Sequence, residues 1–145
     1  MAQKIEEMSE DDEIGIEKQR NWVRDHFGPG LKHLYGTLEG KLSLLETILR
    51  QNWIEPNETW KLQSLGITFG DALAQKLKMH WVMVEDEHGR DAALHDQGTT
   101  IIVFPLTSIS KRIERDETVD VRELFDSACQ TIARIRSEQS SNGLF

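Results

Sequence analysis

The sequence has a single cysteine, Cys129, among 145 residues. One thiol cannot form an internal disulfide framework, and it cannot supply the several thiolates of a cysteine-rich zinc site. We therefore expect a protein of a reducing compartment and assign it to the cytoplasm. A chain of this length is typical of one domain that buries a sizeable core without covalent cross-links.

Long apolar runs are also missing. The longest uninterrupted one, residues 101–106, is far shorter than the ~20 residues that a membrane-spanning helix needs. The first residues, MAQKIEEMSEDDE, are acidic and lack the apolar centre of a secretory signal. We therefore expect neither a signal peptide nor contact with a membrane.

Basic residues are in the minority, since 17 Lys and Arg stand against 25 Asp and Glu and the net charge is -8. A surface with this balance repels the phosphates of nucleic acids and of anionic lipids. The same charge would steer a basic protein toward the chain. We expect no nucleic-acid partner and consider a protein partner, with a basic protein as the first candidate, while the sequence does not indicate an oligomeric state.

Apolar residues recur at helical spacing before residue 80 and after residue 105. The pattern predicts a helix from Asp12 or Glu13 to the Gly28-Pro29-Gly30 break, a second over 41–53, and a third that opens at Pro56 or Asn57. Gly66 and Gly70 lie on one face of the third helix, where each costs ~1 kcal/mol of helix propensity. We expect another element to approach that face closely.

Between residues 80 and 105 the apolar period changes to that of strands. Strands over 80–85, 91–95 and 100–104, separated by two glycine-containing turns, predict a three-stranded antiparallel meander packed with helices, which is an α+β fold. Two-residue turns would place Trp81, Met83, Leu94, Ile101 and Val103 on one face. His80, Val82, Val84, His95 and Ile102 would share the other, with His80 and His95 as diagonal neighbours.

The last helix has the clearest start signal, because Asp120 precedes Glu123 by three residues in a capping-box arrangement. A short helix after Pro105 precedes it. We predict a flexible acidic lead over 1–12, one α+β domain over 13–136 and a frayed tail over 137–145.

Three segments carry a family resemblance: LGITFGDAL, WVMVEDEHGRD and FPLTSISKRIE. With the upstream TLEGKLSLLETILRQNWI, they make residues 13–130 resemble the bacterial family called domain of unknown function 3806. The resemblance implies a stand-alone bacterial domain of the cytoplasm. It implies no activity, because the family has none assigned that these residues could carry over.

Histidines and carboxylates are the first candidates for chemistry. The chain has five histidines, and His80 with His95 could share a metal if a carboxylate joined them. No HExxH or HxH spacing is present, so we favour structural histidines and predict no metal site and no cofactor. Glu85, Asp86 and Glu87 cluster at a turn, where solvated carboxylates are expected rather than a catalytic pair.

The best small-ligand candidate follows Pro105. Thr107, Ser108, Lys111 and Arg112 fall on the first turns of a helix that follows an apolar strand. Free backbone N–H groups, hydroxyls and two cations in that position could hold an anion. The glycines of a phosphate loop are missing, and ordinary capping with a solvated basic face explains the same residues.

Other residues have structural explanations that we favour. The stretch Gly66–Asp71 could line a groove, but tight packing of its helix is the preferred interpretation. The four tryptophans are expected in the core or at its boundary rather than in a binding stripe. Cys129 lies beside an apolar stripe and has no paired base in view, which favours a packed residue over a nucleophile.

Two functions therefore remain. The leading hypothesis is a non-enzymatic binding module that acts on a protein partner, of which toxin neutralisation would be one version. The alternative is a small-anion or nucleotide-type ligand binder, or an enzyme, centred on the helix start after Pro105. A deep pocket lined by Thr107, Lys111 and Arg112 would favour the alternative, and a surface patch without one would favour the module.

Overall fold

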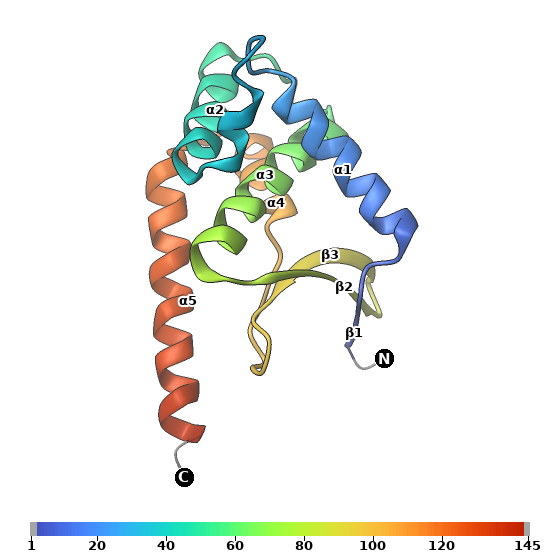
Figure 1. Cartoon of the computed structure of the whole chain (residues 1–145), viewed down its shortest axis with the longest axis vertical. Coiled ribbons are helices and arrows are strands. Elements are labelled where there is room, and N and C mark those ends of the chain that lie inside the picture. Colours follow the sequence, from blue (N-terminus) through green and yellow to red (C-terminus); the bar gives the residue numbers. More distant parts are fainter. Residues whose placement is uncertain (1–2, 144–145) are drawn as a thin grey trace.

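The computed structural model describes residues 3–143 as an α+β fold. Its elements, in chain order, are β1 (Lys4–Glu6), α1 (Glu10–Arg24), the 3-10 helix η1 (Lys32–Gly36), α2 (Leu38–Gln51), α3 (Thr59–Leu77), β2 (His80–Asp86), β3 (Gly89–His95), β4 (Ile102–Val103), α4 (Leu106–Glu114) and α5 (Val121–Gly143). Figure 1 shows α1, α2, α3 and α4 gathered above the sheet, with α5 running down one side. None of the described helices is long and apolar enough to cross a bilayer.

The sheet is antiparallel, with its strands in the order β1-β2-β3-β4. The predicted meander is confirmed, and so are its faces, because Trp81 lies opposite Leu94 and Leu94 opposite Val103.

Some details of the predicted strands were wrong. Strand β3 begins earlier than predicted, at Gly89, and β4 is shorter than the predicted 100–104, spanning only Ile102–Val103. His80 lies directly opposite His95 rather than diagonally, and a fourth strand, β1, pairs along part of β2.

The acidic lead predicted over 1–12 contains this fourth strand and the start of α1. A strand of three residues is too short to show a period, so the sequence pattern does not reveal it. Helix α1 begins at Glu10, because the Ser9 hydroxyl accepts a hydrogen bond from the Asp12 amide (3.1 Å) and the Asp12 carboxylate accepts one from the Ser9 amide (2.9 Å). This reciprocal cap moves the helix start ahead of the predicted Asp12 or Glu13.

Two further helix ends differ from expectation. Helix α3 begins at Thr59, beyond the predicted Pro56 or Asn57. The tail predicted to fray over 137–145 continues α5 to Gly143, and residues 144–145 lie outside the described part. The Gln139 amide donates to the Thr100 hydroxyl (2.9 Å), which ties this last part of α5 to the loop before β4. Asp120 caps α5 as predicted, by accepting from the Glu123 amide at 3.1 Å.

Helix α3 is the centre of the molecule and is buried on most of its faces. A Cβ on Gly66 would lie 2.5 Å from the backbone of Leu106, and one on Gly70 would lie 2.5 Å from the Trp81 ring. The close approach expected from the two glycines is therefore confirmed, and tight packing rather than an open groove explains the stretch from Gly66. On another face of α3, Phe69 meets Phe125 of α5 edge to face.

Candidate functional site

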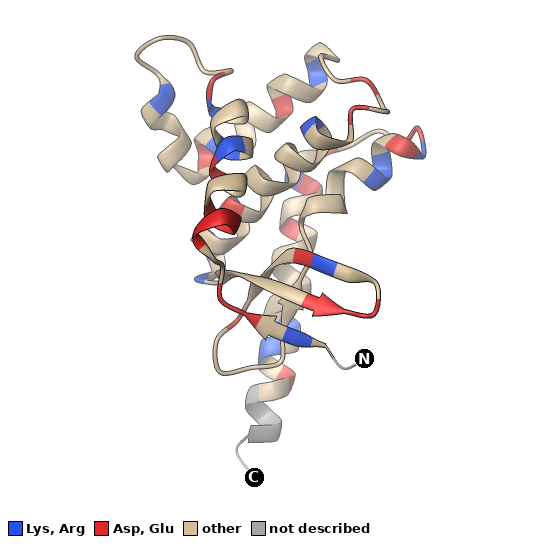
Figure 2. Cartoon of the chain, turned by 90° about the vertical axis from the view of Figure 1, so that its right-hand side faces the viewer, with Lys and Arg blue, Asp and Glu red and all other residues tan. Residues whose placement is uncertain are grey.

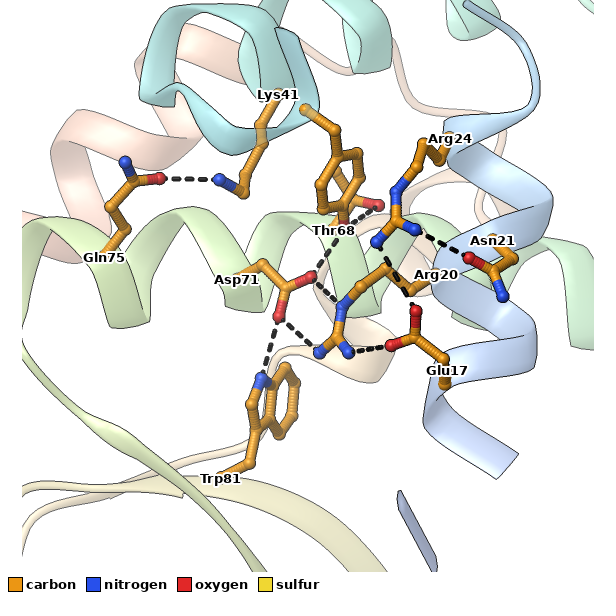
Figure 3. Close-up of polar contacts among 10 residues, drawn as sticks. Glu17, Arg20, Asn21, Arg24, Lys41, Thr68, Asp71, Gln75 and Trp81 are labelled. Atoms are coloured by element: carbon orange, nitrogen blue, oxygen red, sulfur yellow. Dashed lines mark hydrogen bonds and ion pairs between the residues drawn. The ribbon is translucent and has the colours of Figure 1, made fainter. Parts of the chain in front are cut away.

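A single carboxylate, Asp71, joins four elements beneath α1. Its Oδ2 accepts hydrogen bonds from Arg20 Nε (2.7 Å) and from the Tyr35 hydroxyl (2.5 Å). Its Oδ1 accepts from Arg20 Nη2 (2.9 Å) and from Trp81 Nε1 (2.9 Å). These donors come from α1, η1 and β2 and converge on α3, and Figure 3 shows Arg20 and Trp81 hydrogen-bonded to Asp71. The bidentate pairing of Arg20 with Asp71 is the strongest geometry for such a contact.

The Asp71 network is largely buried, and its groups hydrogen-bond to one another. Tyr35 is buried, and its hydroxyl also lies 3.0 Å from the Thr68 hydroxyl. Burial and the neighbouring Asp71 carboxylate together hold the pKa of Tyr35 far above its usual range, so the phenol keeps its proton. Each Asp71 oxygen already accepts two hydrogen bonds, which leaves the carboxylate little capacity to act as a base. The arrangement fits a structural role for Asp71, which holds other elements against α3, better than a catalytic one.

Beside this network lies a cavity of about 690 Å³ between α1 and the start of β2. Arg20 and Trp81, both bound to Asp71, form its inner wall. Its lining comes from the segment before α1, from one face of α1, from β2 and from the β3–β4 loop: Glu7, Met8, Glu10, Glu13, Ile14, Ile16, Glu17, Arg20, His80, Trp81, Val82 and Gln97. We call this feature the α1–β2 cleft.

The cleft combines an acidic rim with apolar surface. Four of its residues are glutamates, Glu7, Glu10, Glu13 and Glu17. Figure 2 shows acidic residues gathered over the start of α1 and the chain that leads into it. Among them Ile14 is 47% exposed, although it is large and apolar. Exposed apolar surface framed by one sign of charge is typical of a site for a partner of the opposite charge.

Two other cavities are less distinctive. One of about 740 Å³ lies between the end of α2 and the loop before α5; it is also mainly acidic, but none of the described residues that line it is a strongly exposed large apolar side chain. One of about 370 Å³ lies on the other side of α1, where Arg90 and Asp12 form an ion pair at 2.7 Å. Like the cleft, the smaller cavity is mainly acidic and includes an exposed apolar side chain, Trp60, but it has about half the volume.

The four residues predicted as an anion site all lie on helix α4. Thr107 and Ser108 are partly buried, Lys111 is exposed, and Arg112 donates to the backbone carbonyl of Ser108 at 2.7 Å. None of the four lines any of the three cavities described above. The start of α4 instead packs its backbone against Gly66 of α3.

The histidines have different surroundings, including His80 and His95, which lie opposite each other in the sheet. His80 lines the α1–β2 cleft, His95 contacts the Thr99 carbonyl at 3.0 Å, and His26 stacks on Trp53. Within residues 3–143, no group of three or more histidine, cysteine or acidic side chains is placed to hold a metal. Cys129 is half-buried on α5, and burial raises the pKa of its thiol.

The tryptophans divide into two groups. Trp81 is bound to Asp71, whereas Trp22 and Trp60 meet edge to face with ring centroids 6.2 Å apart. Trp53 and Trp60 are 50% and 49% exposed, which is more than the expected core or boundary positions imply.

Sequence reasoning did not find the Asp71 network or the α1–β2 cleft. In the sequence Asp71 only ends a glycine-containing stretch, and its partners lie up to 51 residues away in the chain. The sequence feature that could have pointed to Asp71 is a charged side chain within a largely apolar helix segment, because such a residue needs a buried partner.

Comparison with known proteins identifies the family. The sequence model of the family described as domain of unknown function 3806 matches residues 41–125, which is more than half of the chain. The chain belongs to this family. The matched segment contains Asp71 and Trp81, whereas Arg20, Tyr35 and the glutamates of the cleft precede it. The resemblance predicted from the sequence is therefore confirmed.

One solved structure supports the fold over a longer span. A crystal structure from Bacteroides thetaiotaomicron superimposes with a TM-score of 0.69 and 15% sequence identity, covering 89% of this chain. This chain spans only 48% of that one, so it corresponds to about half of the larger protein. At this identity the likeness shows a shared fold alone. No curated protein matches the sequence.

Proposed function

We propose that this domain is a non-enzymatic binding module of the cytoplasm, and that the α1–β2 cleft receives a basic segment of a partner protein. The observation that carries the proposal is the acidic rim around exposed apolar surface. Lysine and arginine side chains suit both parts, because their aliphatic stems cover apolar surface while their charges meet carboxylates. The net charge of -8 would speed the encounter with such a partner.

The Asp71 network supports a binding role over a catalytic one. Among the described side chains, no buried nitrogen or oxygen lacks a hydrogen-bond partner. Groups that are fully engaged with one another hold a wall in place and have no spare capacity for proton transfer. Arg20 and Trp81 thus give the cleft a rigid inner wall, which reduces the entropy lost on binding.

Position-specific photo-crosslinking in a bacterial host that carries this chain natively would test the proposal. The photo-reactive amino acid p-benzoylphenylalanine replaces Ile14 in the cleft or, as a control of equal exposure, Leu31 in the loop before η1. We expect an adduct with one protein at position 14 and not at position 31. The crosslinked peptide of that protein should be basic.

Charge reversal separates recognition from chance contact. The double change Glu10→Lys with Glu13→Lys should abolish the adduct at position 14, whereas Glu114→Lys with Glu117→Lys, which alters the same charge beyond the cleft, should preserve it. Identical adducts at both positions, or an adduct that survives reversal in the cleft, would overturn the proposal.

A further inference from the structure

The edge of β2 that borders the cleft is only half covered. Strand β1 pairs with Met83, Val84 and Glu85, and no described strand pairs with His80–Val82 on that side. The opposite side of β2 is paired with β3 along its whole length. An uncovered strand edge presents backbone N–H and C=O groups that another extended chain can pair with.

The cleft follows this edge. His80, Trp81 and Val82 all line the cavity, although neighbouring side chains of a strand point to opposite faces of the sheet. A cavity over one face would be lined by alternate residues, so three in a row place it along the edge itself. On its far side are Glu7 and Met8, where the chain leaves β1 and turns toward α1.

We propose that the basic segment binds by strand addition, in line with β1 and paired with His80–Val82. The inference rests on the proposed function and specifies the shape of the ligand. A strand rises about 3.3 Å per residue, so three to five residues of the partner would fill this edge. Backbone pairing would supply affinity without regard to sequence, and the glutamates would supply selectivity.

The geometry also predicts the spacing of the basic residues. Trp81 points to the face where Asp71 and α1 lie. Every second side chain of an added strand would point to the same face, toward Glu10, Glu13 and Ile14. The preferred segment therefore carries lysine or arginine at alternate positions, and the residues between them are free to vary.

Selection from a phage library of random linear nine-residue peptides would provide the probe. The wild-type domain is the bait, and the Glu10→Lys, Glu13→Lys variant removes peptides that bind elsewhere. The expected winners carry basic residues at alternate positions. If no peptide distinguishes the two baits, both the basic partner and the strand geometry are wrong.

Backbone N-methylation of the selected peptide then tests the geometry alone. Methyl groups on two amides of one alternating set remove the donors that face β2, whereas methyl groups on the other set face away. One methylated peptide should lose at least about tenfold in affinity and the other should bind nearly as well as the parent. If both methylated peptides bind equally or fail equally, strand addition is wrong. If the parent peptide still requires Glu10 and Glu13, the proposed binding of a basic segment stands without it.

Discussion

Arg20 lies between a buried carboxylate, Asp71, and the exposed glutamates of the cleft. On its inner side Asp71 is only 11% exposed and accepts four hydrogen bonds from three side chains. On its outer side Glu17 is 45% exposed and begins the row of glutamates along the cleft. The inner carboxylate is fixed by its donors, while the outer ones are more exposed, although Glu17 also pairs with Arg20 at 2.6 Å and with Arg24 at 3.5 Å.

The difference shows how burial assigns a role to the same functional group. Removing a carboxylate from water is unfavourable unless donors replace the lost hydration, so Asp71 is retained only with its full set of partners. Exposed glutamates keep their hydration and contribute little to folding, and their value lies in the field that they create. We therefore expect substitutions inside to affect stability and substitutions outside to affect binding.

The largest expected effect on stability comes from replacing the buried carboxylate. Asp71→Ala should lower the free energy of unfolding by about 3 kcal/mol, near the lower end of the range for a broken buried pair, because Arg20 keeps Glu17 as a partner. Glu13→Ala on the cleft should change it by less than about 0.5 kcal/mol. Denaturant melts of the two variants measure both values, and equal losses would show that the cleft glutamates are structural.

The fold could be predicted well from the sequence, because it depends on periodicity. Helices before and after an antiparallel sheet, the shared face of Trp81 and Leu94 and the cap at Asp120 all follow from local patterns. Strand β1 has only three residues and exists because it adds to β2, so no local pattern specifies it. The end of α5 is likewise held by a contact between Gln139 and the loop residue Thr100.

The candidate site could not be predicted, because it depends on contacts between distant segments. Arg20, Tyr35 and Trp81 meet Asp71 only after α1 and η1 have packed on α3. The predicted anion residues depend on their neighbours in the chain, which do not reveal that the start of α4 packs against Gly66 of α3. Local sequence places a residue on an element, whereas a site needs the arrangement of several elements.

Gly70 offers a second test, because it packs against Trp81, which both binds Asp71 and lines the cleft. A Cβ at this position would come within 2.5 Å of the Trp81 ring and 2.8 Å of Pro105. Gly70→Ala should therefore displace the Trp81 indole from Asp71 and destabilise the fold by ~1–3 kcal/mol, despite the better helix propensity of alanine.

Gly15→Ala on α1 is the matched control for Gly70→Ala. A Cβ there meets no atom within 4 Å, so this change should stabilise the protein by up to ~1 kcal/mol. The indole N–H signals in NMR spectra report whether Trp81 has moved. An unchanged Trp81 signal together with an unchanged melt in the Gly70→Ala variant would show that the packing is looser than described.

The smallest expected effect concerns a carboxylate outside both regions, Asp12, which pairs with Arg90 on the sheet at 2.7 Å. The hydrogen bond from Arg90 holds the pKa of Asp12 well below its usual range. A depressed folded-state pKa stabilises the protein above the unfolded value, and this contribution decreases as the pH falls toward the folded value. The stability gap between wild type and Arg90→Gln should thus be constant from pH 7 to about pH 5 and narrow below about pH 4. Urea melts at a series of pH values measure the gap, and a gap that widened with acid would show that Arg90 acts through another group.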